Sequence, residues 1–192
     1  MPRRSAPLSS PRRIPAVVNV ASGSVDAARQ ALAVNGGFDV REVQPEAVGP
    51  AVRAIVGEGA RRVLVAGGDG TIATAAAALL DTRVELAILP GGTLNHFARD
   101  MAISTTAVEA LALASDGEPR TVDVGLVNGR LFINTSSVGA YVRFVGLRER
   151  LEQRFGYRLA SLFAGIHLLL TARRMAVEGE VDGRTRIFRT AF

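Results

Sequence analysis

The sequence predicts an α/β fold built on a mostly parallel sheet with helices on both faces. Two observations carry this prediction: strand and helix patterns alternate through the first two-thirds of the chain, and two of the predicted strands run into glycine-rich turns. Such alternation is typical of βαβ units, whose strands lie parallel. After Pro119 the pattern changes, which predicts the start of a second, β-rich domain.

The first two strand–helix pairs follow from the spacing of their apolar residues. An apolar run over 14–20 predicts a strand, and helical spacing over 25–34 predicts a helix that a pair of glycines ends. The alternating pattern of residues 38–43 predicts a second strand. A helix is expected over 45–56, because a proline stands near the start of that segment.

The third and fourth strands are expected over 62–66 and 85–89, and a glycine-rich turn follows each of them. An alanine-rich helix over 72–80 comes after the first turn, and helices over 94–101 and 105–114 come after the second. Ligands of such sheets bind at the carboxyl ends of the strands, where both turns lie.

The last third of the chain combines hairpins with helices. An Asn-Gly pair between two apolar runs predicts a β-hairpin over 120–135. Helical stretches are expected over 142–173, and another hairpin over 175–192. The second strand of this hairpin stops without a further partner, a cap or a polar terminus, so we expect the chain to end inside the second domain.

The amino-acid composition excludes several kinds of catalytic site, metal site and partner. All 23 basic residues are arginines, and a chain without lysine has neither a Walker A loop nor a Schiff-base lysine. The absence of cysteine excludes disulfides and thiolate zinc sites, and it fits a cytoplasmic location. The longest apolar stretch, 159–172, is too short and interrupted for a membrane span. The arginines do not cluster with aromatic residues, so nucleic acid is not an expected partner.

The run Gly67-Gly68-Asp69-Gly70-Thr71 is the most informative segment. It joins an apolar strand to a helix, and its glycines let phosphate oxygens approach the N–H groups at the helix start. A bare carboxylate repels phosphate, so we expect Asp69 to hold Mg²⁺ through water or to accept a proton. Thr71 is expected to cap the helix or to contact phosphate. An ordinary strand-to-helix turn is the alternative.

A second glycine turn, Pro90-Gly91-Gly92-Thr93, runs into Leu94-Asn95-His96. Gly92, Thr93 and Asn95 are candidates for the same pocket, and the alternative is that Thr93 or Asn95 caps the next helix. His96 is more often a capped or packed histidine than a catalytic base.

Three segments together resemble the diacylglycerol kinase catalytic-domain family, which includes bacterial lipid kinases and sphingosine kinases. Asn19-Val20-Ala21-Ser22-Gly23 is similar to the family's Asn-Pro-x-Ser-Gly loop, with valine in place of proline. Residues 67–71 match its Gly-Gly-Asp-Gly-Thr, and residues 90–99 are similar to its Pro-x-Gly-Thr-x-Asn-Asp-Phe-Ala-Arg. The resemblance implies an N-terminal domain of the fold shared by NAD kinases and diacylglycerol kinases.

This resemblance also implies an activity: an ATP-dependent lipid kinase that transfers the γ-phosphate to the hydroxyl of a lipid such as diacylglycerol. The chain then divides into a disordered basic tail (1–13), an α/β nucleotide-binding domain (14–118) and the start of a β-rich substrate domain with linking helices (119–192). By residue-by-residue carry-over, the ATP site would consist of Ser22, Gly23, Gly67, Gly68, Asp69, Gly70, Thr71, Gly92, Thr93 and Asn95.

Mg²⁺ is implied together with ATP. In kinases of this kind, carboxylates matching Asp69 and Asp123 take part in a water-bridged Mg²⁺ network. His96 stands where the family has a further aspartate, which weakens the metal contact at that corner. The family's general base would lie beyond Phe192, with Asp69 in a supporting role. We therefore expect this chain to bind nucleotide and to be weak or inactive as a kinase.

Two other functions remain open. The chain is alternatively a non-catalytic nucleotide-binding module, or an NAD kinase, since NAD kinases share the Gly-Gly-Asp-Gly turn. A peripheral contact with the inner membrane face is a further expectation, because the apolar stretch 155–171 is flanked by arginines. Its alternative is a packed helix that links two domains. The sequence does not predict the oligomeric state.

Overall fold

The structure is a computed structural model that describes residues 13–135, 140–171, 175–181 and 184–190. The predicted tail therefore lies, apart from Arg13, outside the described residues. The chain divides after Asn134 into two compact units, which are described separately below.

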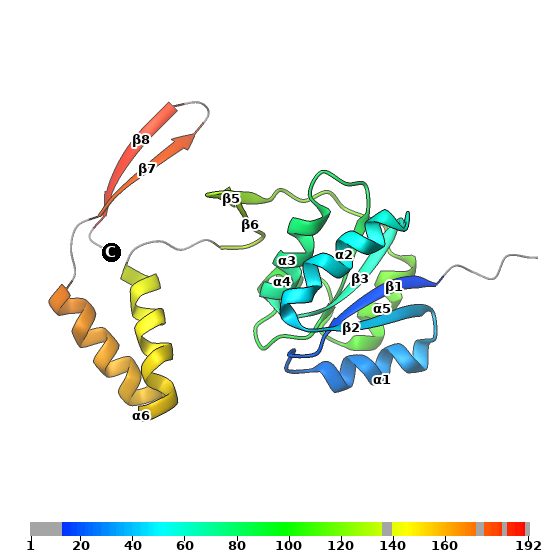
Figure 1. The fold of residues 1–192 in the computed structure, drawn as a ribbon, viewed down its shortest axis with the longest axis horizontal. Helices are drawn as coiled ribbons and strands as arrows, with labels where there is room; N and C mark the ends of the chain where they lie inside the picture. The colour runs from blue at the N-terminus through cyan, green and yellow to red at the C-terminus, as the bar shows by residue number, and fades with distance from the viewer. Residues whose placement is uncertain (1–12, 136–139, 172–174, 182–183, 191–192) are drawn as a thin grey trace, which may run out of the picture. The chain divides into compact units, whose positions relative to one another are not determined.

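The first unit is built on a four-stranded parallel sheet with the strand order β2-β1-β3-β4 (Figure 1). The strands are β1 (Ile14–Asn19), β2 (Phe38–Val43), β3 (Arg62–Gly67) and β4 (Glu85–Pro90). All four predicted strands are confirmed. Because β1 and β3 occupy the centre, their side chains are buried on both faces, which explains why both read as nearly continuous apolar runs.

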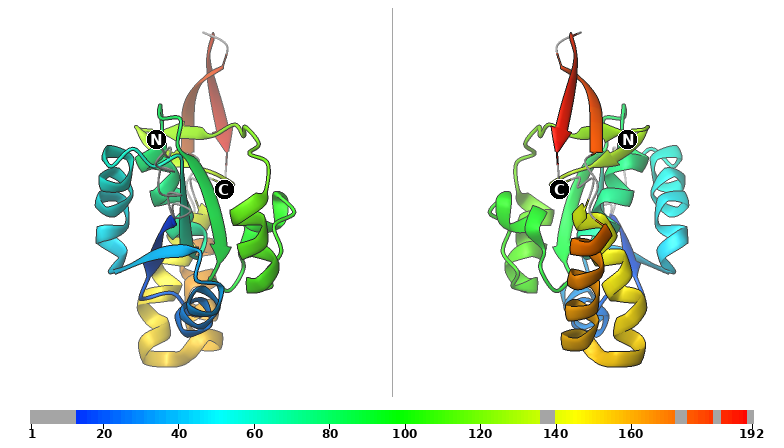
Figure 2. Two further views of the ribbon diagram at one scale, coloured as in Figure 1. Left: turned by 90° about the vertical axis from the view of Figure 1, so that its right-hand side faces the viewer. Right: turned by 90° about the vertical axis from the view of Figure 1, so that its left-hand side faces the viewer.

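Helices cover both faces of this sheet (Figure 2). One face carries α1 (Val25–Asn35) and α5 (Ala107–Asp116), which supply Leu32 and Leu111 to one buried cluster. The other face carries α2 (Val48–Gly57), preceded by the short 3-10 helix η1 (Pro45–Ala47), and α3 (Asp69–Leu79).

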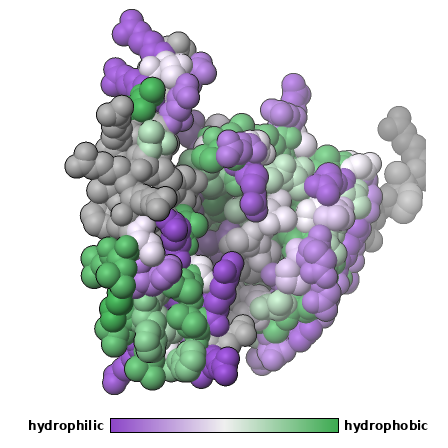
Figure 3. All heavy atoms as spheres, turned by 60° about the vertical axis from the view of Figure 1, so that its left-hand side comes forward, coloured by the Kyte–Doolittle hydropathy of each residue, from purple (hydrophilic) through white to green (hydrophobic). Residues whose placement is uncertain are grey.

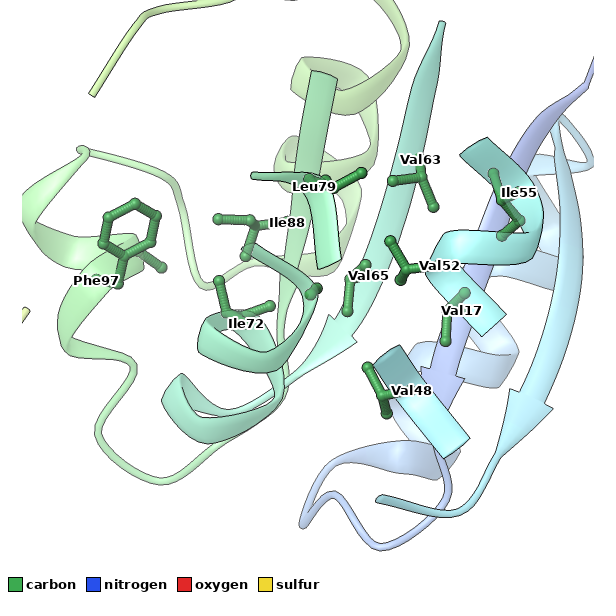
Figure 4. Packing of buried hydrophobic residues seen from close by; sticks show 12 residues of the cluster. Val17, Val48, Val52, Ile55, Val63, Val65, Ile72, Leu79, Ile88 and Phe97 are labelled. Atoms are coloured by element: carbon green, nitrogen blue, oxygen red, sulfur yellow. The ribbon is translucent and has the colours of Figure 1, made fainter. Parts of the chain in front are cut away.

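The second buried cluster lies between the sheet and the pair α2–α3 (Figure 4). Val17 and Val65 project from the central strands toward Val52 of α2, and each of the three is fully buried. A further short helix, α4 (His96–Asp100), adds Phe97 to the same cluster. The core is therefore made where the βαβ units pack their apolar helix faces onto the sheet.

Two of the helix boundaries that differ from the prediction lie at the glycine turns. The first glycine turn is not a loop throughout, because α3 begins at Asp69 rather than at Ile72. The helix expected over 94–101 is shorter, because Asn95 takes a left-handed conformation with φ 50° and separates Leu94 from α4.

The predicted Asn-Gly hairpin is confirmed, although its strands are short. β5 (Gly125–Val127) pairs antiparallel with β6 (Arg130–Phe132) across Asn128 and Gly129, which both have positive φ, as a type I′ turn requires. This hairpin belongs to the first compact unit, and Ile133 packs against the buried cluster of α2 and α3. The first unit thus extends past the boundary expected at residue 118.

The second unit contains a broken helix and a hairpin. α6 (Ala140–Thr171) is interrupted at Gly156, whose φ of 73° and ψ of 164° are not helical and favour glycine. The two arms of α6 are followed by β7 (Met175–Val181) and β8 (Arg184–Thr190), which pair antiparallel as predicted. No helix among the described residues is both long and apolar enough to cross a membrane.

A guanidinium group fastens α5 to the amino ends of β3 and β4. Arg62 donates through Nε to Glu85, and its other nitrogens donate to the carbonyl oxygens of Ala114, Ser115 and Gly117 at the end of α5. The branched guanidinium group is required, because four acceptors surround this one side chain.

We expect Arg62→Ala to lower the free energy of unfolding by about 1–2 kcal/mol, since the pair with Glu85 is partly exposed. Arg62→Lys keeps the charge but loses the branched set of donors, so its free energy of unfolding should lie between those of wild type and Arg62→Ala. Urea unfolding of both variants tests this. Equal stability of Arg62→Ala and wild type would contradict the assigned role.

Two ion pairs hold the edge strand β2 to helices. Arg29 of α1 binds Glu42 at 2.7 Å, and Arg41 binds Glu58 beyond the end of α2 at 2.6 Å. Hydrogen bonds from the arginines lower the pKa of the Glu42 and Glu58 carboxyls below their ordinary value of 4.5. Lowered values mean that each pair contributes stability above the unfolded-state pKa and loses it as the pH falls through the folded-state pKa.

We expect Arg29→Gln to return the titration midpoint of Glu42 to about 4.5, because its charged donor is lost. Carboxyl carbon shifts measured by NMR across the acid range follow this midpoint. Glu58 is the internal control, since its partner is Arg41 and its midpoint should not move. An unchanged Glu42 midpoint would show that Arg29 is not its partner in solution.

Candidate nucleotide-binding site

Three loops meet at the carboxyl ends of β1, β3 and β4. The parallel register places Gly67 opposite Pro90, and the ladder continues one step further through a hydrogen bond from Gly91 N to Gly67 O of 2.9 Å. The two glycine turns predicted to share a pocket are therefore neighbours at one edge of the sheet.

The two turns approach so closely that side chains are excluded. A Cβ atom on Gly92 would lie 2.6 Å from Gly68 Cα, and one on Gly91 would lie 3.2 Å from Gly67 Cα. The first distance leaves no room for a methyl group beside a backbone atom, and the second would require the opposing backbone to shift by a few tenths of an ångström. Glycine is required here by this contact between backbones rather than by a positive φ.

The loop after β1 is bonded to both turns. The Asn19 amide donates to Thr71 Oγ1 at 2.8 Å and accepts from Ala21 N at 3.0 Å, so this buried side chain is satisfied on both sides. The Ser22 hydroxyl donates to Gly91 O at 2.5 Å. Asn19 was not among the predicted site residues, although a polar residue at the end of a buried strand was the available signal.

Asp69 joins the first turn to the helix that follows the second. Its two carboxylate oxygens accept hydrogen bonds from His96 N and Phe97 N, each at 3.0 Å. These are the first two residues of α4, so Asp69 caps that helix from 27 residues away. Asn95, one of the two residues expected as a cap, occupies the N-cap position of α4, but its side chain makes no capping bond.

Asn95 holds the second turn in shape. Its Oδ1 accepts from Gly92 N at 2.8 Å and its Nδ2 donates to Gly92 O at 2.7 Å. Both ends of this buried amide are thus used within the loop, so Asn95 shapes the turn rather than presenting a free amide to a ligand.

The start of α3 has no such cap. Gly68 is its N-cap residue and makes no side-chain bond, and Thr71, expected as a cap, is the third residue of the helix and accepts from Asn19 instead. The N–H groups of the first turn are therefore free of side-chain caps at the point where the glycine turns meet. Such a helix start favours an anion.

The predicted site residues thus divide into three groups. Ser22, Gly67, Gly68, Asp69, Thr71, Gly92 and Asn95 are joined by these contacts. Gly23, Gly70 and Thr93 are exposed on the same three loops. Asp123 is exposed in the segment before β5, and no bond between it and Asp69 is found in the described part of the chain.

These residues do not form a direct metal cage. Within the described ranges, no three His, Cys, Asp or Glu side chains gather closely enough to hold a metal ion. Both oxygens of Asp69 already accept backbone hydrogen bonds. Any Mg²⁺ here would depend mainly on ligands other than protein carboxylates, as is usual for Mg²⁺ that accompanies nucleotide phosphates.

A parallel sheet with two glycine turns in contact and an uncapped helix start at the ends of its strands is an arrangement that favours an anion such as phosphate. The model of the diacylglycerol kinase catalytic domain matches residues 14–127. The chain therefore belongs to the diacylglycerol kinase catalytic-domain family, as the three motifs implied.

Curated relatives agree with this assignment. The chain is 35% identical over 126 residues to a diacylglycerol kinase of Bacillus subtilis, covering 64% of this chain and 41% of that protein. It is 39% identical over 139 residues to a YegS-like lipid kinase of Pseudomonas savastanoi, covering 68% of this chain and 44% of the relative. The chain thus spans less than half the length of these relatives.

Solved structures support the fold. A diacylglycerol kinase structure from Bacillus anthracis superposes with a TM-score of 0.67 at 23% identity, covering 94% of this chain and 62% of the other. At this identity the similarity establishes the α/β architecture and the start of a second β region.

Proposed function

We propose that the chain is the nucleotide-binding part of an ATP-dependent lipid kinase, which transfers the γ-phosphate of ATP to the hydroxyl of a lipid such as diacylglycerol. The observation that carries the proposal is the uncapped start of α3 between two glycine turns. The family and the names of its relatives support kinase chemistry on a lipid. We expect the activity in the cytoplasm, where ATP is available.

In this proposal each loop has a separate task. Phosphate oxygens accept hydrogen bonds from the N–H groups of Asp69, Gly70 and Thr71 at the start of α3. Ser22 and Asn95 hold the second turn against the first, so the phosphate position is fixed before ATP arrives. Mg²⁺, when bound with ATP, neutralises part of the phosphate charge. Asp69 maintains the geometry of the site by accepting from both amides at the start of α4.

Nucleotide binding and phosphoryl transfer are tested separately. Calorimetry with Mg·ATP measures the first, and transfer of labelled phosphate from ATP to diacylglycerol in mixed micelles measures the second. Binding with transfer supports the kinase, and binding without transfer supports a nucleotide-binding module. Transfer to NAD rather than to lipid would favour an NAD kinase, and absence of ATP binding would refute the proposal.

A further inference from the structure

Asn19 is a polar side chain in an otherwise apolar part of the fold. It ends the central strand β1 and is 7% exposed, whereas most hydrophilic side chains project from the surface (Figure 3). Among the described residues only Asn95 is a polar residue buried to a similar degree, and its amide is used within its own turn. A buried amide costs free energy unless its polar atoms are bonded, so the bonds of Asn19 indicate its role.

The two bonds of Asn19 fix the direction in which its amide points. The backbone N–H of Ala21 can only donate, so the atom that faces it at 3.0 Å is the amide oxygen Oδ1. The amide nitrogen Nδ2 therefore faces Thr71, and it donates to Thr71 Oγ1 at 2.8 Å. Because an amide nitrogen does not accept hydrogen bonds, the Thr71 hydroxyl can only be the acceptor in this contact. The proton of that hydroxyl must point elsewhere.

The Thr71 hydroxyl is left as a free donor. Within the described part of the chain the structure gives its proton no acceptor, whereas Thr74, one turn later in α3, donates its hydroxyl to Gly70 O at 2.9 Å. The Thr71 side chain has little freedom to turn, because it packs on Gly67: a Cβ atom added to Gly67 would lie 2.5 Å from Thr71 Cβ. Thr71 is only partly buried, so a ligand can reach this hydroxyl.

A directed hydroxyl in the first turn of α3 adds a donor to the backbone N–H groups there. The oxygens of an ionised phosphate only accept hydrogen bonds, and such charge-assisted bonds are among the strong ones. We propose that Asn19 is a positioning residue, which turns the proton of the Thr71 hydroxyl toward the phosphates of a bound nucleotide. The inference rests on the proposed function, and it names a residue outside the glycine turns on which phosphate binding depends.

Asn19→Asp tests the direction of the proton, because it exchanges the donor for an acceptor with little change in size. The Thr71 hydroxyl would then donate to the new carboxylate and would be lost to a phosphate. We expect Mg·ATP binding, measured by calorimetry, to weaken by about tenfold or more. Thr71→Val removes the hydroxyl and should weaken binding by a similar factor, and Thr71→Ser should retain most of the wild-type affinity.

The new carboxylate also repels phosphate by its charge, so a second pair of variants isolates the route through Thr71. Asn19→Ala leaves the hydroxyl free to rotate and should weaken binding by about threefold in wild type. In the Thr71→Val background the same change should cost nothing further, because the two residues act as one unit. A merely structural role of Asn19 would weaken binding equally in both backgrounds. Thr74→Val is the control, and its Mg·ATP affinity should equal that of wild type.

The side-chain amide signals of Asn19 provide a measurement that requires no change at Asn19, should those variants not fold. On addition of Mg·ATP the Nδ2 signals should shift in the ¹⁵N-labelled wild type and not in Thr71→Val. Shifts that are equal in both proteins would overturn the inference. Wild-type affinity in Asn19→Asp would overturn it as well and would leave the proposed function intact, whereas absence of Mg·ATP binding by wild type would refute both.

Discussion

Gly92→Ala is expected to abolish nucleotide binding by this chain. The added methyl group would lie 2.6 Å from Gly68 Cα and 3.0 Å from Asn95 Oδ1. The first of these atoms is backbone and cannot rotate away, so the turns must separate. Loss of two or three phosphate hydrogen bonds would weaken Mg·ATP binding by about 100-fold or more. The same strain should lower the free energy of unfolding by about 1–3 kcal/mol.

Gly57→Ala is the matched control for this variant. Gly57 lies at the end of α2, far from the turns in sequence, and a Cβ atom there meets nothing within 4 Å. Alanine should leave Mg·ATP affinity unchanged and stabilise the helix by up to about 1 kcal/mol. Thermal unfolding and binding of a fluorescent ATP analogue measure both effects. Wild-type affinity in Gly92→Ala would mean that the close contact of the turns is unimportant for the nucleotide.

Asp69→Ala is expected to release α4 from the first glycine turn. It removes two charge-assisted hydrogen bonds, leaves the amides of His96 and Phe97 without their acceptors, and uncaps a helix of only five residues. We expect a loss of about 2–4 kcal/mol in the free energy of unfolding. Mg·ATP affinity should fall by about tenfold or more, because the second turn is no longer held in place.

The amide signals of His96 and Phe97 distinguish this role from a general loss of stability. In wild type, both amides should exchange slowly with solvent because the Asp69 carboxylate accepts from them, and in Asp69→Ala they should exchange faster than the amides of the sheet. Asp100→Ala is the control, because Asp100 is exposed at the other end of α4 and its removal should leave both amides protected. Protection that persists without the Asp69 carboxylate would rule out the cap.

The sheet could be predicted from the sequence because its determinants are local. The central strands are nearly continuous apolar runs, and glycine-rich turns mark the ends of β3 and β4. The Asn128-Gly129 turn likewise follows from two residues that tolerate positive φ. For the same reason the two glycine turns could be assigned to one edge of the sheet, since parallel strands carry their carboxyl ends to the same side.

The bonds within the site could not be predicted, because they join residues far apart in the sequence. Asn19 bonds to Thr71 across 52 positions, and Ser22 bonds to Gly91 across 69. Asp69 shows the consequence most clearly. Its sequence neighbours suggest a metal or a proton as the partner of the carboxylate, and they give no indication that it also accepts from two backbone amides of α4.

The central claim is that nucleotide phosphates bind at the start of α3, between the two glycine turns. The most direct measurement is a titration of the ¹⁵N-labelled chain with Mg·ATP, followed through its backbone amide signals. The account predicts saturable shifts that are largest at Asp69, Gly70 and Thr71, with smaller shifts at Gly92. Saturable shifts confined to other parts of the chain, or no shifts from a folded protein, would contradict it.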